Sequence, residues 1–193
     1  MSKSLGALSI SSAALLLIIL LYRLMSESSV QLPVLGHVPE FSLVNSREEI
    51  TTREKLKGKV WIADFIFTTC AGPCPIMSTK MAEISDHFLK KIDVGLVSIS
   101  VNPDYDTPQV LSAYAQKFTG NTEKWQFLTG DYDDIQNIIV NGFKIGDPDE
   151  IVFHSTKFAL VDRHSRIRGY YGGLENEEIE RLKKDILVLL DES

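Results

Sequence analysis

The sequence has no excess of positive charge, no block of like charge and no periodic repeat. Its 20 lysine and arginine residues stand against 26 aspartate and glutamate residues, which gives a net charge of −6. This acidity argues against a nucleic-acid-binding protein, and the lack of a repeat argues against a repeat array. A hydrophobic share of 44% is enough for a real core, so the chain is not disordered throughout.

Charge is also absent from residues 5–21, which are rich in Leu, Ile, Ala and Ser and lie between Lys3 and Arg23. A hydrocarbon core ~30 Å thick needs roughly 20 helical residues, and residues 5–25 supply that length. No small-x-small cleavage site follows the apolar run, which favours an uncleaved anchor over a secretory signal. We therefore predict a transmembrane helix within residues 1–29, which also hold a cytoplasmic tip and a tether, and one folded domain in residues 30–193.

The charges that flank the apolar segment predict its orientation. Lys3 and the terminal amine lie on one side, against Arg23 and Glu27 on the other, so the positive-inside tendency places the N-terminus in the cytoplasm. The domain is then expected in an extracytoplasmic, periplasm-like compartment, where thiols can be oxidised. Removing Lys3, Arg23 and Glu27 leaves 18 basic and 25 acidic residues, so the domain itself carries a net charge of −7.

Hydrophobic period and turn residues predict alternating strands and helices in the domain. We expect a hairpin at 41–50, strands at 59–67, 94–101, 125–128, 157–161 and 167–171, and helices from the cysteines to 90 and at 108–118, 132–143 and 176–190. The run at 59–67 is apolar at nearly every position, which is typical of a central strand buried on both faces. The pattern indicates an α/β fold with a mixed sheet flanked by helices, most simply a thioredoxin-like fold.

The only two cysteines lie in the segment Cys70-Ala71-Gly72-Pro73-Cys74. If this loop winds into the first turn of the next helix, positions i and i+4 share one face, with Cα atoms roughly 6 Å apart. That separation permits both a disulfide and joint ligation of a soft metal. A helix N-terminus also stabilises thiolates. A structural disulfide over so short a loop would contribute little stability, which favours a redox or metal role.

Two thiolates are a poor complete metal site, so a third ligand is expected. Three of the four histidines, His37, His87 and His164, are most simply surface residues. His154 precedes the strand at 157–161, which in a thioredoxin-like sheet neighbours the strand that ends at the cysteines. From the residues alone it is equally a ligand or a hydrogen-bonded loop histidine. Two thiolates and an imidazole suit Cu(I) better than structural zinc. Met77 and Met81 are expected in the core rather than as ligands.

Several motifs lie within about residues 37–173. They are Val38-Pro39-Glu40-Phe41-Ser42-Leu43, Leu56-Lys57-Gly58-Lys59-Val60-Trp61, Phe67-Thr68-Thr69-Cys70 through Cys74-Pro75, Val97-Ser98-Ile99-Ser100-Val101, Asp106-Thr107-Pro108, Leu128-Thr129-Gly130 and His154-Ser155. Together they resemble the SCO/SenC family of copper-binding proteins. The specific signal is their order: Cys-x-x-x-Cys-Pro, then Pro-x-x-Asp-Thr-Pro, then His-Ser before a strand. The Asp106-Thr107-Pro108 turn also has a structural explanation, because a capping side chain before an N1 proline starts a helix.

The resemblance implies a thioredoxin fold, a membrane anchor and copper, as Cu(I) or Cu(II), bound by Cys70, Cys74 and His154. It also implies a partner, the copper-bearing subunit of a respiratory oxidase; another copper chaperone or a thiol reductant is a further candidate. The chain departs from the family pattern at Ala71, where proline is common, and at Asn102 and Phe153, where aspartate is frequent. The missing carboxylates remove partners that would orient an imidazole.

Two functions follow from this resemblance and the cysteine pair. The first is a copper metallochaperone for cytochrome c oxidase assembly. The second is a membrane-anchored thiol-disulfide oxidoreductase, which needs Cys70 and Cys74 as an exchanging pair but does not need His154. Peroxide reduction is disfavoured because no arginine lies near the cysteine loop.

Overall fold

The computed structural model describes residues 15, 31–145 and 155–192. The chain divides into two compact units, residues 1–31 and residues 32–193. Within the described ranges, no helix has both the length and the apolar character needed to cross a bilayer. The segment predicted to span the membrane lies outside the described residues, apart from Leu15, and so does His154.

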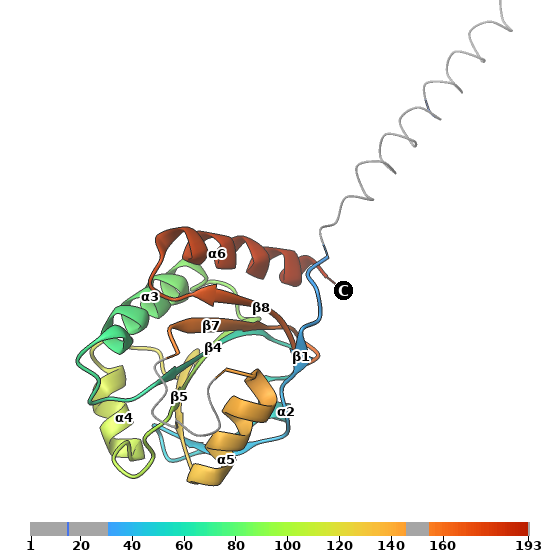
Figure 1. Ribbon diagram of the computed structural model, residues 1–193. Coiled ribbons are helices and arrows are strands. Elements are labelled where there is room, and N and C mark those ends of the chain that lie inside the picture. The colour runs from blue at the N-terminus through green and yellow to red at the C-terminus, as the bar shows by residue number, and fades with distance from the viewer. Residues whose placement is uncertain (1–14, 16–30, 146–154, 193) are drawn as a thin grey trace, which may run out of the picture. The chain divides into compact units, whose positions relative to one another are not determined.

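One mixed sheet organises the second unit (Figure 1). Its eight strands follow the order β1-β8-β7-β4-β5-β6-β2-β3. Their bounds are β1 Gly36–His37, β2 Ser42–Asn45, β3 Ile50–Thr52, β4 Val60–Ile66, β5 Val94–Ser100, β6 Trp125–Thr129, β7 Lys157–Val161 and β8 Arg166–Gly172. The central strand β4 pairs in parallel with β5 and antiparallel with β7, so the predicted mixed sheet is confirmed.

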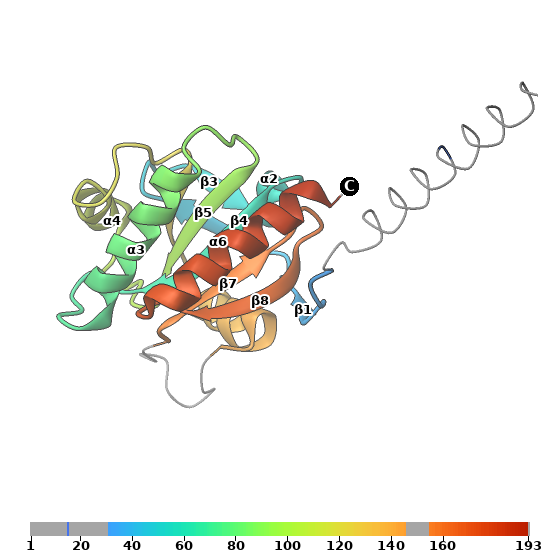
Figure 2. The same cartoon turned by 90° about the horizontal axis from the view of Figure 1, so that it is seen from above.

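Helices cover both faces of this sheet. They are α2 Arg53–Leu56, α3 Pro73–His87, α4 Pro108–Ala115, α5 Tyr132–Asn137, the π-helix η1 Ile138–Phe143 and α6 Asn176–Asp191. Helices α3, α4 and α6 pack on one face, and α2, α5 and η1 supply core residues on the other. Figure 2 shows α3 and α6 side by side on their shared face. The predicted arrangement of a sheet flanked by helices is confirmed.

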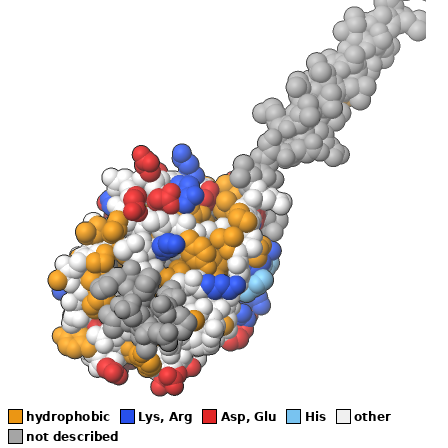
Figure 3. Space-filling model, viewed as in Figure 1, with side chains coloured by type: hydrophobic (Ala, Val, Ile, Leu, Met, Phe, Trp, Pro, Cys, Tyr) orange, Lys and Arg blue, Asp and Glu red, His pale blue; other side chains and the backbone are white. Residues whose placement is uncertain are grey.

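The sequence explains the main elements. All seven residues of β4 are buried, as the apolar run predicts for a central strand. Helix α4 begins where Thr107 caps it by accepting a hydrogen bond from the Val110 N–H, with Pro108 at the first helical position. In α6 the apolar side chains recur on the buried face, and its charged side chains gather at the top of the view in Figure 3.

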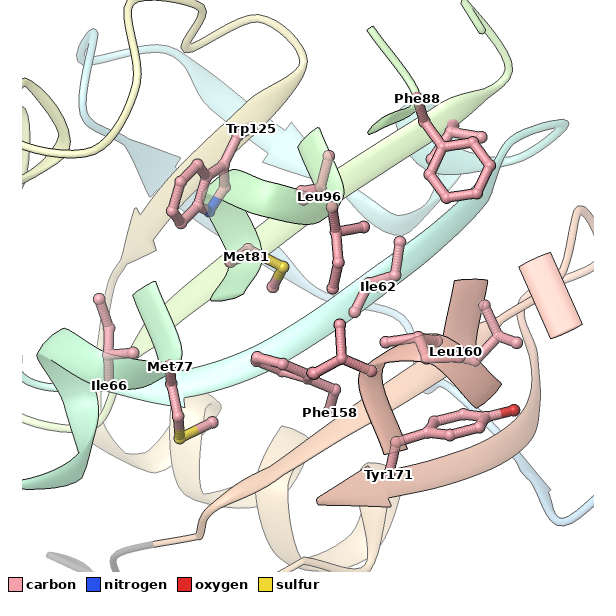
Figure 4. Packing of buried hydrophobic residues seen from close by; sticks show 14 of the residues in the cluster. Ile62, Ile66, Met77, Met81, Phe88, Leu96, Trp125, Phe158, Leu160 and Tyr171 are labelled. Atoms are coloured by element: carbon pink, nitrogen blue, oxygen red, sulfur yellow. The ribbon is translucent and has the colours of Figure 1, made fainter. Parts of the chain in front are cut away.

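The core between the sheet and α3 is where the two methionines lie. Met77 and Met81 are buried in one cluster with Ile62, Trp125 and Phe158 (Figure 4). Their prediction as core residues is confirmed, because their thioethers fill space between α3 and the sheet. This packing fixes α3 against β4 and thereby fixes the start of α3, where the cysteines lie.

Three local features differ from the prediction. The strand β1 and the short helix α2 were not predicted. The helix expected at 132–143 ends as an α-helix at Asn137 and continues as a π-helix to Phe143. Gly142 lies within this π-helix so close to Pro39 that a Cβ atom would stand 2.4 Å from the proline Cδ. The contact between a distant proline and a glycine in the helix is a tertiary feature that hydrophobic period does not encode.

Candidate metal centre

The cysteine loop, residues 67–72, follows the carboxyl end of the central strand β4, and Asp106 holds it there. This carboxylate is fully buried. Its Oδ2 accepts hydrogen bonds from the Thr68 backbone N–H at 3.1 Å and from the Ser100 hydroxyl at 2.5 Å, and its Oδ1 accepts one from the Thr68 hydroxyl. Asp106 thus ties the loop two residues before Cys70 to the end of β5, the neighbouring strand.

The cysteines lie on either side of the start of α3. The helix begins at Pro73, so Cys74 is its second residue and Cys70 precedes it. The condition that both cysteines share the first helical turn is therefore not met, because only Cys74 lies within the helix. Gly72 keeps a non-helical backbone at φ −110°, ψ −113°, which a residue without a Cβ atom tolerates. Both thiols are nonetheless buried and free, and they interact directly.

Hydrogen-bond donors converge on the sulfur of Cys70. Burial alone would raise the pKa of this thiol, but the backbone N–H groups of Cys74 and Gly72 and the thiol of Cys74 donate to it. Together these donors outweigh the burial and lower the pKa of Cys70. The start of α3 therefore favours a thiolate at Cys70, as predicted for a helix N-terminus.

The second thiol has the opposite preference. Burial raises the pKa of Cys74 to about 12, although the Phe67 backbone N–H donates to its sulfur. The neighbouring sulfur of Cys70 and the negative charge of Asp64 raise it further. Cys74 therefore keeps its proton, whereas Cys70 ionises readily. This difference suits Cys70 as a nucleophile and Cys74 as its partner thiol.

A buried carboxyl group, Asp64, lies in the middle of β4 on the face that α3 covers. Burial raises its pKa to about 7, although its Oδ1 accepts a hydrogen bond of 2.5 Å from Ser98. Ser98 in turn accepts one of 2.9 Å from the Trp125 indole. The other oxygen, Oδ2, has no hydrogen-bond partner among the described residues. A carboxyl group with one unpaired buried oxygen is stable mainly when protonated.

The histidines divide as the sequence suggested. His37, His87 and His164 are exposed, which confirms their prediction as surface residues. His154 lies outside the described residues. Within the part of the chain that the structure describes, no group of three or more His, Cys, Asp or Glu side chains could hold a metal ion. Of the three predicted copper ligands, the described residues include only Cys70 and Cys74.

Two residues of this region escaped the sequence reasoning. Asp64 could have been noticed in the sequence, because it is the one carboxylate inside an otherwise apolar strand. The capping explanation of the Asp106-Thr107-Pro108 turn is confirmed at Thr107, but the hydrogen bonds of Asp106 to the cysteine loop were not predicted. A buried aspartate that joins two segments 38 residues apart depends on the strand order, which the local motif does not reveal.

Comparison with known proteins gives a consistent family match. The SCO1/SenC family model matches residues 33–190. The SCO1 protein homolog of Bacillus subtilis (strain 168) is 31% identical over 160 residues, covering 80% of this chain and 83% of that protein. The family match therefore spans nearly all of the second unit, residues 32–193.

Two solved structures are also similar. BsSco, described as a member of the Sco family of cytochrome c oxidase assembly proteins with a disulfide switch, is 30% identical with a TM-score of 0.73. That alignment covers 84% of this chain and 99% of BsSco. Copper-bound ScoI of Arabidopsis thaliana is 26% identical with a TM-score of 0.67, covering 82% of this chain and 100% of that chain.

Proposed function

Because this chain belongs to the SCO1/SenC family, we propose that it is a copper metallochaperone. It binds copper through Cys70, Cys74 and His154 and assists maturation of the copper site of a respiratory cytochrome c oxidase. Copper is its cargo, and the copper-bearing subunit of the oxidase is its partner. A related Sco protein carries copper in its solved structure, and another belongs to a family of cytochrome c oxidase assembly proteins.

The observation that carries this proposal is the direct interaction of two free thiols at the start of α3. Thiolates are soft ligands that select Cu(I), which accepts low coordination numbers. Both sulfurs already receive backbone N–H hydrogen bonds, from Gly72 and Cys74 at one sulfur and from Phe67 at the other. These donors stabilise thiolates and would continue to do so when a cation replaces the shared proton.

The residues that follow His154 support it as the third ligand. The Thr156 carbonyl accepts a hydrogen bond of 2.6 Å from the Gly173 N–H. A Cβ at Gly173 would lie 3.0 Å from the Thr156 oxygen and 3.1 Å from Met77. Met77 is one helical turn beyond Cys74, so Thr156 lies close to the turn of α3 that bears this cysteine. Two residues of chain span at most about 7 Å, so the position of Thr156 supports the proposal of His154 as the third ligand.

A second function is favoured by the unequal pKa values of the two thiols. In a thiol-disulfide oxidoreductase, the Cys70 thiolate would attack a partner disulfide and release one partner thiolate. Cys74 would then lose its proton and attack the Cys70 sulfur, which forms the Cys70–Cys74 disulfide and releases the second partner thiolate. Two electrons pass to the partner, and a thiol reductant must restore the pair. The disulfide switch described for BsSco is consistent with such chemistry.

The anchor is part of the same proposal. Residues 5–25 span the membrane with the N-terminus in the cytoplasm, residues 26–29 form the tether, and the domain from residue 30 is extracytoplasmic. The absence of charge from residues 5–21 supports this topology. In that compartment the cysteines meet both oxidants and the copper-bearing face of a respiratory enzyme.

The two functions differ in whether they need His154: the metallochaperone does, and the oxidoreductase does not. We would load the reduced chain with Cu(I), dialyse it, and measure bound copper and insulin reduction for the wild type, for His154→Ala, and for His164→Ala as a matched control in an exposed turn. The metallochaperone should hold one copper per chain, lose most of it in His154→Ala, and keep it in His164→Ala. A wild type that retains no copper refutes this function, and insulin reduction that persists in His154→Ala favours the oxidoreductase.

A further inference from the structure

The loop that follows α3 exposes two apolar side chains on either side of a pair of lysines. Ile92 is 86% exposed, the largest value among the exposed large hydrophobic side chains in the described ranges, and Leu89 is 59% exposed. Between them lie Lys90 and Lys91, both exposed. Apolar tips flanked by ammonium groups are the composition of surfaces that enter the headgroup region of a bilayer.

A groove beside this loop adds to its positive charge. The groove has a volume of about 380 Å³ and is lined by Lys59, Lys90, Lys91 and Lys124, with Glu123 as its only acidic lining residue. Asp93 is exposed in the same loop, which leaves four positive and two negative charges. The loop and its groove are therefore basic, although the chain as a whole carries a net charge of −6.

The basic loop lies at the end of the sheet where the chain enters the domain. Arg168 binds the carbonyl oxygens of Leu32 and Pro33 at the start of the described domain. It also binds Asp162, which follows the last residue of β7, and β7 pairs antiparallel with the first half of β4. The amino end of β4 in turn pairs with the start of β5 beside the loop, because the Val60 N–H donates to the Asp93 carbonyl.

The cysteines lie at the opposite end of the same strands. Strand β4 has seven residues, which span ~23 Å at ~3.3 Å each. Figure 2 shows the start of α3 at one end of the domain, and the loop after α3 and the last turn of α6 toward the other. The entry point and the basic loop thus share one end, and the thiols occupy the other.

We propose that this end, defined by Leu89, Lys90, Lys91 and Ile92, rests on an anionic lipid bilayer, the membrane that holds the N-terminal anchor. The inference rests on the anchor in the proposed function. The tether and first domain residues, 26–31, span at most about 20 Å when fully extended, so the entry end stays near the bilayer surface. Lysines near an anionic surface are attracted to it, and Ile92 enters the interface.

This orientation has a consequence for copper delivery. With the basic loop on the bilayer, the thiols face away from it at a height of roughly 25 Å, the length of β4 plus part of the cysteine loop. The acceptor site would then have to lie at a similar height above the membrane. An anionic lipid surface thereby sets the position and direction in which the cysteine end is presented.

The test uses the full chain reconstituted into vesicles of phosphatidylcholine alone, or of phosphatidylcholine and phosphatidylglycerol in equal amounts. An amine-reactive reagent labels exposed lysines, and mass spectrometry reports labelling of Lys90 and Lys91. Lys157, exposed at the cysteine end of β7, is the internal reference. We expect labelling of Lys90 and Lys91 to fall roughly tenfold in the anionic vesicles at low salt and to recover at high salt, with Lys157 unchanged.

Two variants sharpen the result. Ile92→Glu should abolish the protection, whereas Ile76→Glu, a matched change at an exposed isoleucine of α3 near the cysteines, should keep it. Equal labelling in both kinds of vesicle overturns the inference, and so does protection that persists in detergent, which would indicate a protein partner or a second copy. Flotation with neutral vesicles tests the anchor separately. A chain that does not float overturns both the anchor and the docking of the loop. A chain that floats, but whose Lys90 and Lys91 are not protected in anionic vesicles, overturns the docking alone.

Discussion

Replacing Asp64 by asparagine should remove a pH-dependent loss of stability. The pKa of Asp64 is raised from 3.8 to about 7 because the carboxyl group is completely buried. Below pH ~4 the carboxyl is protonated in both the folded and the unfolded chain, so it imposes no penalty. Between pH ~4 and ~7 only the unfolded chain ionises, and the free energy of unfolding falls as the pH rises. Above pH ~7 the folded chain carries the buried charge and the loss is complete.

The magnitude follows from the shift. A rise of about three units at ~1.4 kcal/mol per unit corresponds to about 4 kcal/mol lost across this window. In Asp64→Asn the amide keeps an acceptor for the Ser98 hydroxyl and cannot ionise. The variant should therefore match the wild type near pH 4 and exceed it by about 4 kcal/mol near pH 8.

Urea unfolding of the full chain in mild detergent measures this difference. Trp61 and Trp125 are both fully buried, so their fluorescence should report loss of the core. The other carboxylates titrate alike in both proteins and cancel when the two unfolding free energies are subtracted. If the difference between Asp64→Asn and the wild type stays constant from pH 4 to pH 8, the buried carboxyl does not titrate as argued.

Three further outcomes can be checked separately. Near neutral pH, iodoacetamide should alkylate Cys70 roughly tenfold faster than Cys74, because backbone N–H groups lower the pKa of Cys70 and burial raises that of Cys74 to about 12; equal rates by peptide mass spectrometry would contradict this asymmetry. Asp162→Asn should lower the free energy of unfolding by about 2 kcal/mol at neutral pH, because the buried Arg168 guanidinium loses one of its two carboxylate partners and keeps only Glu192. Since hydrogen bonds from the arginines hold the pKa of Asp162 below its usual range despite its burial, this loss should shrink as the pH falls below ~4 in urea titrations. Gly142→Ala should destabilise by about 1–3 kcal/mol, measured as a lower melting temperature, because its Cβ would meet Pro39 at 2.4 Å.

Much of the fold could be predicted because local signals agree with the final packing. The apolar run of β4 predicted a central strand, and the recurring apolar residues of α6 predicted its buried face. The methionines of α3 were predicted in the core for the same reason, since their spacing matches a helix face. Where the hydrophobic period of a segment matches the face that it buries, the sequence alone is enough to predict the element.

The details of the site depend on contacts between distant segments. The start of α3 is set by Gly72 before Pro73, so Cys70 reaches Cys74 from outside the helix. Asp106 holds the cysteine loop only because β4 and β5 are adjacent, and the motif around Asp106 indicates helix capping instead. These arrangements follow from strand order, which local periodicity does not encode.

The central claim is that one copper ion binds two sulfurs and one imidazole of this chain. X-ray absorption at the copper edge of the reduced, copper-loaded full chain tests it most directly. The account predicts two sulfur neighbours at about 2.2–2.3 Å and one histidine nitrogen, with one sulfur lost in Cys74→Ser and the nitrogen lost in His154→Ala. A spectrum with only oxygen or nitrogen neighbours, or one unchanged in both variants, would contradict it.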